Sequence, residues 1–414
     1  MSAISNHSGA GRFWSGALAS LLAVACGASA APSRADEPTR ADEEAAPEPG
    51  PMAAEIEVEG GQWQPTPTGT VPVGSSDSPA PCPWVDRNAM PIGRSGMASA
   101  QHGGLVYLFG GEVLDARTYA PNVSSEDLDA RRSMVQAYDP ANDTWASKQR
   151  MPAGVVDLAA SSVGDAIYVF TGFGSDGFAN QVYRYEPATD TWSETSRVPV
   201  YRDRFMSEAV AGKVYLIGGS GQADDGPGVG GYWYSKAGLE IFDPATNTWS
   251  QGTPAPGAIN GGASCVLGQR IFVFDGVVTG ATYIYDTATN TWSEGAPAPE
   301  ARTWMSCAVN EGKLLLLGGR EPLSHEVDPV PAGPDAFGGK TIESSDLIQE
   351  YDPGTNTWRE YGRMPRAREQ FAAIPFGREL YLIGGTESHT KEGPYGSFIL
   401  DEVVAFSNDA ICAR

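Results

Sequence analysis

Four arginines recur at one position of a pattern that repeats along the chain. Each stands shortly before a segment of small and apolar residues, in a chain whose Lys and Arg total only 28 against 51 Asp and Glu. A guanidinium group binds a carboxylate or a phosphate through two parallel hydrogen bonds. The pattern therefore predicts a local positive ring that binds an acidic ligand, or arginines that pair with neighbouring carboxylates such as Asp203 and Glu369. The four residues are Arg94, Arg202, Arg302 and Arg368.

Polar and aromatic neighbours of these arginines would supply further ligand-binding groups. Arg204 and Asn260 carry hydrogen-bond donors, and Trp304 could stack on the face of a sugar ring. The remaining polar neighbours at this position are Asp157, Asp203 and Gln370.

The sequence lacks the common motifs that bind metals, nucleotides or acyl groups. Its five Cys and four His form no CxxC pair and no HExxH, and GxSxG and a Walker A loop are absent as well. We therefore expect no cofactor and no metal. His325, Glu326 and Asp328 could approach Glu387 and His389 and hold a divalent ion, although solvated loop residues are the favoured interpretation.

The N-terminal part of the chain predicts export. Residues 13–26 form an apolar segment after Arg12 that is too short to span a membrane and has the length of a signal-peptide core. Cleavage after Ala30 and lipidation of Cys26 remain alternatives, because the sequence around Cys26 resembles a bacterial lipoprotein box. We expect a signal peptide over 1–30 and an extracytoplasmic protein, which is periplasmic, secreted or tethered to the outer membrane through a lipidated Cys26.

Residues 31–81 are rich in Pro, Ala and Glu and predict a disordered linker, because they offer little apolar surface to offset the entropy of ordering. The formal net charge of the chain is −23. Such a charge argues against nucleic-acid binding, which requires clustered Lys and Arg. The 50 Gly and 10 Trp favour many turns between strands that carry aromatic residues.

One pattern recurs from residue 82 onward with a period of roughly fifty residues. An apolar segment ends in a small doublet, and a second segment then ends in an aromatic residue and Asp-Pro before a turn and Thr-Trp. The apolar segment fits a strand buried between neighbouring sheets, and the Trp packs between them. The doublets are Gly110-Gly111, Thr171-Gly172, Gly218-Gly219, Asp275-Gly276, Gly318-Gly319 and Gly384-Gly385.

This pattern resembles the kelch repeat, whose signature is a Gly-Gly doublet followed by a Tyr and a Trp at fixed spacing. The resemblance implies an all-β fold, a six-bladed kelch β-propeller over residues 82–414 with four strands in each blade. Six doublets are followed by only five Thr-Trp motifs, and Trp84 near the N-terminus supplies the sixth. We therefore expect this N-terminal strand to complete the last blade and to close the ring.

The predicted closure has a consequence for the cysteines. It brings Cys82 close to Cys412, and export permits oxidation, so we favour a disulfide between them over two free thiols. Cys265 and Cys307 occupy matching positions of adjacent inner strands. For this pair we expect buried small hydrophobic residues rather than a bridge or a metal site.

Long insertions are expected on the same face as the arginines, over the mouth of the central channel. They would wall a pocket there, and Tyr232-Trp233-Tyr234 could form a lid or simply pack within its own loop. The ranges are 112–135, 220–238, 320–347 and 386–402.

Two functions follow from this picture. The first is a monomeric, non-catalytic recognition module that binds a protein partner or an acidic glycan at the channel mouth. The second is an enzyme, a sugar mutarotase similar to the exported kelch N-acetylneuraminate epimerases, in which a propeller binds an acidic sugar at this place. The export signal, the six repeats and the arginines agree with that comparison, whereas the long linker and the insertions depart from it. Opening a sugar at its anomeric carbon requires a general acid or base. If the resemblance holds, Glu369 is the candidate for that catalytic role, because Glu208 falls too far along its segment.

Overall fold

The computed structural model describes residues 84–113, 125–174, 177–221, 234–276, 280–321, 343–388 and 397–407. The chain divides into two units, 1–73 and 74–414, and all described residues belong to the second unit. The predicted signal peptide with Cys26, the predicted linker, and both Cys82 and Cys412 lie outside the described residues. Within the described part, no helix has the length and apolar character needed to cross a membrane.

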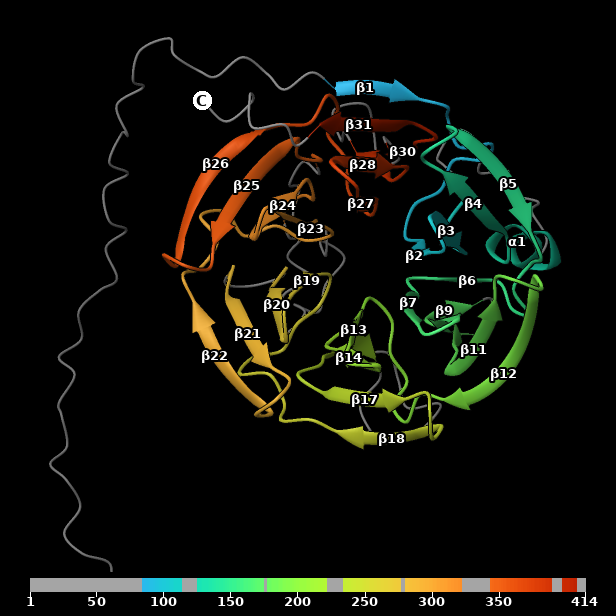
Figure 1. The fold of residues 1–414 in the computed structure, drawn as a ribbon, viewed down its shortest axis with the longest axis horizontal. Coiled ribbons are helices and arrows are strands. Elements are labelled where there is room, and N and C mark those ends of the chain that lie inside the picture. Colours follow the sequence, from blue (N-terminus) through green and yellow to red (C-terminus); the bar gives the residue numbers. More distant parts are fainter. Residues whose placement is uncertain are drawn as a thin grey trace, which may run out of the picture. The chain divides into compact units, whose positions relative to one another are not determined.

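Six four-stranded antiparallel sheets are arranged in a ring, as Figure 1 shows, and each sheet is one blade. Blades 1 to 3 begin at the centre of the ring and run outward. Blade 1 contains β2 (Ala98–His102), β3 (Leu105–Phe109), β4 (Val135–Asp139) and β5 (Thr144–Lys148). Blade 2 contains β7 (Ala159–Val163), β8 (Ala166–Phe170), β11 (Gln181–Glu186) and β12 (Thr191–Arg197). Blade 3 contains β13 (Met206–Val210), β14 (Lys213–Ile217), β17 (Leu239–Asp243) and β18 (Thr248–Gln251).

Blades 4 to 6 repeat this order. Blade 4 contains β19 (Ala263–Leu267), β20 (Arg270–Phe274), β21 (Thr282–Asp286) and β22 (Thr291–Gly295). Blade 5 contains β23 (Ser306–Asn310), β24 (Lys313–Leu317), β25 (Leu347–Asp352) and β26 (Thr357–Arg363). Blade 6 contains β27 (Ala372–Phe376), β28 (Glu379–Ile383), β31 (Val403–Ser407) and β1 (Trp84–Arg87). The sequence-based expectation of a six-bladed β-propeller is confirmed.

Short elements outside the six sheets belong to the connections between the second and third strands of a blade, except β6, which connects blades 1 and 2. They are α1 (Ser125–Arg132), β6 (Val155–Val156), β9 (Phe173–Gly174), β10 (Gly177–Phe178), β15 (Ser220–Gly221), β16 (Tyr234–Ser235), β29 (Thr386–Ser388) and β30 (Ser397–Ile399). Two of the predicted insertions thus contain a small hairpin, β15–β16 and β29–β30. Tyr232 and Trp233 lie outside the described residues.

The ring closes in blade 6, where strands from both ends of the chain pair. β1 runs antiparallel to β31, with Trp84 opposite Phe406, and these two rings pack 4.8 Å apart between centroids. The Trp84 Nε1–H donates to the backbone oxygen of Arg363 in blade 5. Trp84 therefore occupies the place of the sixth repeat Trp, as the count of motifs predicted.

The repeated aromatic residues connect each blade to its neighbour. In four repeats the Trp Nε1–H donates to a backbone oxygen of the preceding blade at 2.7–2.9 Å. These residues are Trp145, Trp192, Trp292 and Trp358. The Tyr of the same motif donates its hydroxyl to the Asp or Asn five residues later, as Tyr351 does to Asn356 at 2.7 Å. That Asn has a φ of 56°, which Asn and Asp tolerate better than other residues with a side chain. These contacts fix the outer half of each blade.

Candidate functional site

Six residues, one from each blade, surround the mouth of the central channel. All six have a positive φ between 52° and 61°, and each stands two residues before the inner strand of its blade. At five junctions between blades, the backbone N–H of one of them donates to the carbonyl oxygen of its neighbour at 2.7–3.2 Å. We call this set the mouth ring; it consists of Gly96, Asp157, Arg204, Gly261, Trp304 and Gln370.

Three side chains of the mouth ring are held in a conformation that is costly for them. A residue with a Cβ loses about 1 kcal/mol or more in the left-handed region, and only Asn and Asp adopt it with some ease. Gly96 and Gly261 show that glycine serves at this position, yet Arg204, Trp304 and Gln370 occupy it in other blades. Backbone strain of this kind is concentrated at functional sites. The mouth ring is therefore the candidate site.

The mouth ring encloses a pocket of about 130 Å³. The residue after each ring position lines its floor, and five of these residues are apolar side chains that form a collar: Met97, Leu158, Phe205, Met305 and Phe371. Beneath the collar, the inner strands line a second cavity of about 210 Å³ that shares Leu158, Met305 and Phe371 with the first. The site thus has a polar rim over an apolar floor.

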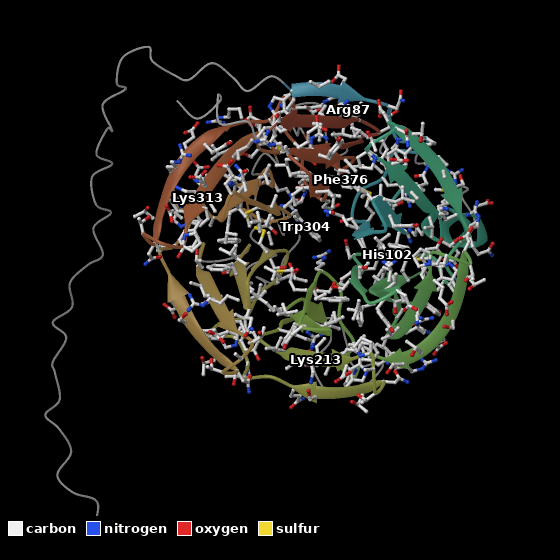
Figure 2. The ribbon with its side chains drawn as sticks, in the orientation of Figure 1. Arg87, His102, Lys213, Trp304, Lys313 and Phe376 are labelled. Atoms are coloured by element: carbon white, nitrogen blue, oxygen red, sulfur yellow. A yellow bond between two sulfur atoms is a disulfide. The ribbon has the colours of Figure 1, made fainter. Side chains whose placement is uncertain are left out.

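Arg204 and Trp304 meet across the mouth. The Arg204 guanidinium carbon lies 5.0 Å from the centroid of the Trp304 ring, a cation–π distance. In Figure 2 the labelled Trp304 lies towards the centre of the ring of blades. Because Arg204 belongs to blade 3 and Trp304 to blade 5, their contact spans Gly261 of blade 4.

Two carboxyl groups flank Arg204. Its Nε lies 3.6 Å from Asp157 Oδ2 and 3.8 Å from Asp203 Oδ2, and Asp203 also accepts a hydrogen bond from the Ser220 hydroxyl. Burial raises the pKa of Asp203 to about 7, and the nearby Asp157 adds to this rise while Arg204 opposes it. Burial likewise raises the pKa of Asp157. These carboxyl groups can therefore exchange protons closer to neutral pH than an ordinary aspartate.

The four repeated arginines do not face the mouth, which corrects the predicted positive ring. Each is at most 2% exposed and lies inside its blade. The Arg94 Nη1 donates to the carbonyl oxygens of Gly110 (3.0 Å) and Met134 (2.9 Å), and its Nη2 donates to Gln136 Oε1 (2.7 Å). In the same way Arg202, Arg302 and Arg368 donate to the first glycine of their own doublets, Gly218, Gly318 and Gly384. Each arginine thus binds the backbone at the glycine doublet, where the second strand of its blade ends beside the start of the third.

Acidic partners complete two of these buried clusters, but they are not Asp203 and Glu369, the partners that the pairing alternative named; those carboxyl groups lie against Arg204 and Arg320. Arg202 pairs with Glu240, and Arg368 pairs with Glu402 at 3.1 Å. Arg94 and Arg302 instead meet the amide oxygens of Gln136 and Gln349. Burial lowers the pKa of Arg94 to about 10, which leaves it charged at neutral pH.

Two other predicted site residues lie next to the mouth ring without lining its pocket. Asn260 is buried directly before Gly261. Glu369 is buried directly before Gln370, where its carboxylate lies 2.7 Å from Arg320 Nε and accepts a hydrogen bond from Ser388 Oγ at 2.6 Å. Of the proposed ligand-binding residues, the structure brings only Arg204 and Trp304 into the pocket lining, together with Asp157 and Gln370.

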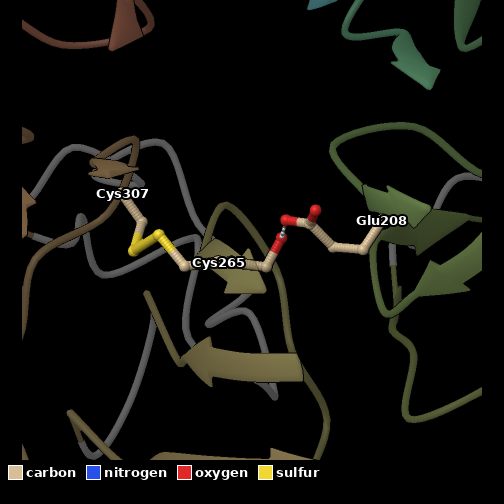
Figure 3. Close-up of a disulfide and its surroundings, with 4 residues drawn as sticks. Glu208, Cys265 and Cys307 are labelled. Carbon is tan, nitrogen blue, oxygen red and sulfur yellow. Dashed lines mark hydrogen bonds between the residues drawn. A yellow bond between two sulfur atoms is a disulfide. The ribbon is translucent and has the colours of Figure 1, made fainter. Parts of the chain in front are cut away.

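A disulfide joins Cys265 to Cys307, which corrects the expectation of two separate thiols. It connects the inner strands β19 and β23 of blades 4 and 5. Figure 3 shows it beside a second link between blades, in which Ser264 Oγ donates to Glu208 Oε1 at 2.6 Å. The equivalent hydroxyl groups of blades 2 and 3, Ser161 and Ser207, lie 2.9 Å apart. Three successive junctions are thus cross-linked at one level of the channel wall.

Glu208 makes the stability of this wall depend on pH. Burial raises its pKa from 4.5 to about 7, so the folded chain binds more protons than the unfolded chain between these pH values. This contribution to stability is complete below pH 4.5 and is lost as the pH rises to 7. We expect Glu208→Gln to raise the free energy of unfolding at pH 8 by about 2 kcal/mol and to leave it unchanged at pH 4. Urea denaturation at both pH values measures this, with the exposed Glu300→Gln as control; equal gains at pH 4 and 8 would contradict it.

The possible metal ligands in the insertions are mostly outside the described residues, namely His325, Glu326, Asp328 and His389. Glu387 is described, and its carboxylate pairs with Arg366 at 2.6 Å. Among the residues that the structure describes, no group of three or more His, Cys, Asp or Glu could hold a metal ion.

Comparisons with known proteins agree with this architecture. A family described as the KLHDC2/KLHL20/DRC7 Kelch-repeats domain matches residues 96–319, more than half of the chain. The solved "Structure of YjhT" superposes with a TM-score of 0.61 at 19% identity, over 77% of this chain and 96% of that chain. At that identity the superposition shows a shared fold only.

Two curated relatives match shorter parts of the sequence. Kelch repeat and BTB domain-containing protein 12 of Danio rerio is 29% identical over 99 residues, which are 24% of this chain and 14% of that protein. Kelch-like protein 23 of Mus musculus is 25% identical over 205 residues, which are 39% of this chain and 36% of that protein. The chain therefore spans about a seventh of the first relative's length and little more than a third of the second's. The family match and the six repeated blades together show that this protein belongs to the kelch-repeat family.

Proposed function

We propose that this protein is an exported recognition module that binds a glycan, presented by an extracellular or envelope partner, at the mouth ring. Kelch propellers are, in general, binding modules. The single observation that carries the proposal is the set of strained side chains Arg204, Trp304 and Gln370 around a pocket with an apolar floor. A sugar presents hydroxyl groups at its edge and C–H groups on its faces. A guanidinium, an amide and a carboxylate beside an aromatic ring match that combination.

The charge of the pocket favours a neutral glycan over an acidic one. Arg94, Arg202, Arg302 and Arg368 are buried inside the blades and cannot contact a ligand at the mouth. Among the described residues there, Arg204 is balanced by the carboxyl groups of Asp157 and Asp203. An added carboxylate would meet these two groups as well as the one arginine, and each of them that is ionised repels it at short range.

Direct binding measurements test this proposal. We expect D-glucose or D-galactose to bind more tightly than D-glucuronate in titration calorimetry, and Trp304→Ala or Arg204→Ala to weaken that binding at least tenfold, or about 1.4 kcal/mol. Arg359→Ala is the matched control, because Arg359 lies over the Tyr361 ring at 5.4 Å on the outer strand of blade 5. Unchanged affinity in both mouth variants would reject the mouth ring as the site. Failure of all three sugars to bind would reject the glycan.

A sugar mutarotase is the second candidate, and the observation that favours it is a pair of carboxyl groups beside Arg204, Asp157 in the pocket lining and the buried Asp203. A carboxyl group with a pKa of about 7 can both accept and donate a proton at neutral pH, as ring opening requires. Glu369 is less suited to this role because it is paired with Arg320. NMR of anomeric exchange would detect the activity, and Asp157→Asn should abolish it; exchange at the uncatalysed rate with wild-type protein would exclude the enzyme.

A further inference from the structure

The disulfide lies close beneath Trp304, the aromatic residue of the mouth ring. Cys307 follows Trp304 by three residues, and Cys265 follows Gly261 by four, so the bond joins the strands that carry both ring positions. Above it, the Trp304 backbone N–H donates to the Gly261 oxygen at 2.7 Å, and the Thr303 hydroxyl donates to the same oxygen at 3.2 Å. One disulfide bond and two hydrogen bonds thus connect blades 4 and 5 over residues 303–307.

Other junctions carry weaker links at the same level. The partners stand four residues after one ring position and three residues after the next, which gives Ser161 with Ser207 and Glu208 with Ser264. The corresponding pair of blades 5 and 6 is Ala308 with Ala373. The disulfide therefore lies at the junction between blades 4 and 5. Trp304 belongs to blade 5 at this junction, and Arg204 of blade 3 extends past blade 4 to contact it.

We propose that the Cys265–Cys307 disulfide is a positioning element of the mouth ring, which fixes Trp304 beneath Arg204 so that ligand binding depends on the oxidised state of this pair. The dependence of ligand binding rests on the proposed function, whereas the positioning of Trp304 does not. Trp304 has a φ of 61° and needs surrounding contacts to hold it there. Without the covalent link, this segment is still joined to blade 4 by the two hydrogen bonds to the Gly261 oxygen, which exchange more readily with water than a disulfide does.

A small dithiol can reach the bond through the channel. Cys307 is partly exposed and lines the 210 Å³ cavity, whereas Cys265 is buried. A thiolate of the dithiol attacks Cys307 Sγ, the Sγ–Sγ bond breaks, and Cys265 leaves as a thiolate that takes up a proton. The second thiol then closes the dithiol into a cyclic disulfide and releases Cys307 as a thiol. Two electrons pass from the dithiol to the protein.

Hydrogen exchange of the intact chain, oxidised and reduced with dithiothreitol, tests the positioning. We expect the Trp304 amide to exchange about tenfold faster after reduction, with amides of the buried strand β8 unchanged as evidence that the propeller stays folded. Tryptophan emission, taken as the difference between wild type and Trp304→Phe, should shift to longer wavelength as the indole gains water.

Matched variants keep the outcome decisive. Ser161→Ala/Ser207→Ala removes the equivalent link between blades 2 and 3 and should leave Trp304 exchange unchanged, whereas Cys307→Ser should reproduce the effect of dithiothreitol. Equal Trp304 exchange and emission in the oxidised and reduced proteins would overturn the proposal. D-Glucose affinity measured on the same samples should fall about tenfold on reduction. Retained affinity despite a mobile Trp304 would reject the link to binding, and absence of binding to the oxidised protein would instead count against the proposed function.

Discussion

Replacement of Arg94 by Ala is expected to lower the free energy of unfolding by about 4 kcal/mol. The guanidinium is fully buried, and three hydrogen bonds connect it to Gly110, Met134 and Gln136. Its removal takes the donor from the buried Gly110 carbonyl oxygen and the Gln136 amide oxygen, and leaves the Met134 oxygen with the Gly110 N–H. A buried polar atom without a partner costs about 1–3 kcal/mol. Urea denaturation followed by circular dichroism measures the loss.

The same experiment separates the structural arginines from the candidate ligand-binding arginine. Arg94→Lys should not restore stability, because an ammonium group cannot reproduce the planar fork that reaches two strands. Arg204→Ala should change the free energy of unfolding by less than about 1 kcal/mol, since Arg204 is partly exposed and its ion-pair distances are long. A loss of free energy of unfolding below about 1 kcal/mol for Arg94→Ala would contradict the structural role of its three hydrogen bonds.

The structural role of these arginines has a signal in the sequence. Each of the four stands 16 residues before the first glycine of its doublet, and each donates to the carbonyl oxygen of that glycine. Blades 2 and 4 carry Val155 and Ile259 in place of the arginine, and their doublets are Thr171-Gly172 and Asp275-Gly276. Arginine and the Gly-Gly doublet therefore occur together. A constant spacing of this kind indicates a contact within the repeat, whereas a ligand site would not require it.

The repeat and its closure could be predicted because both depend on local patterns. Alternating apolar residues, the doublets and the Thr-Trp turns define each blade, and the missing sixth Trp identifies Trp84 as the closing residue. The mouth ring could be predicted only in part. Arg204 and Trp304 were recognised from their chemistry, but the positive φ that all six positions share comes from the packing of neighbouring blades.

The disulfide could not be derived from the sequence because it depends on how adjacent blades are shifted. Cys265 and Cys307 are equivalent when their segments are aligned on Ser-Cys. Measured from the mouth ring, however, Cys265 stands four residues after Gly261 and Cys307 three residues after Trp304. Successive residues of a strand point to opposite sides. The offset of one residue allows the two side chains to face each other across the junction between blades 4 and 5, where equal positions would not.

Removal of this disulfide is expected to lower the free energy of unfolding by about 4 kcal/mol, the chain-entropy value for a closed loop of this size. The two cysteines are 42 residues apart, so the bond restricts the unfolded chain over nearly a whole repeat. Guanidinium denaturation of Cys265→Ala/Cys307→Ala, compared with oxidised and reduced wild type, measures the effect. The variant and the reduced wild type should lose the same amount, because both lack the cross-link in the unfolded state. Ser161→Ala/Ser207→Ala should lose only about 1 kcal/mol, the contribution of one hydrogen bond. Equal losses in the two double variants would mean that the cross-link adds nothing beyond a local contact, and would contradict a restriction of the unfolded chain by this disulfide.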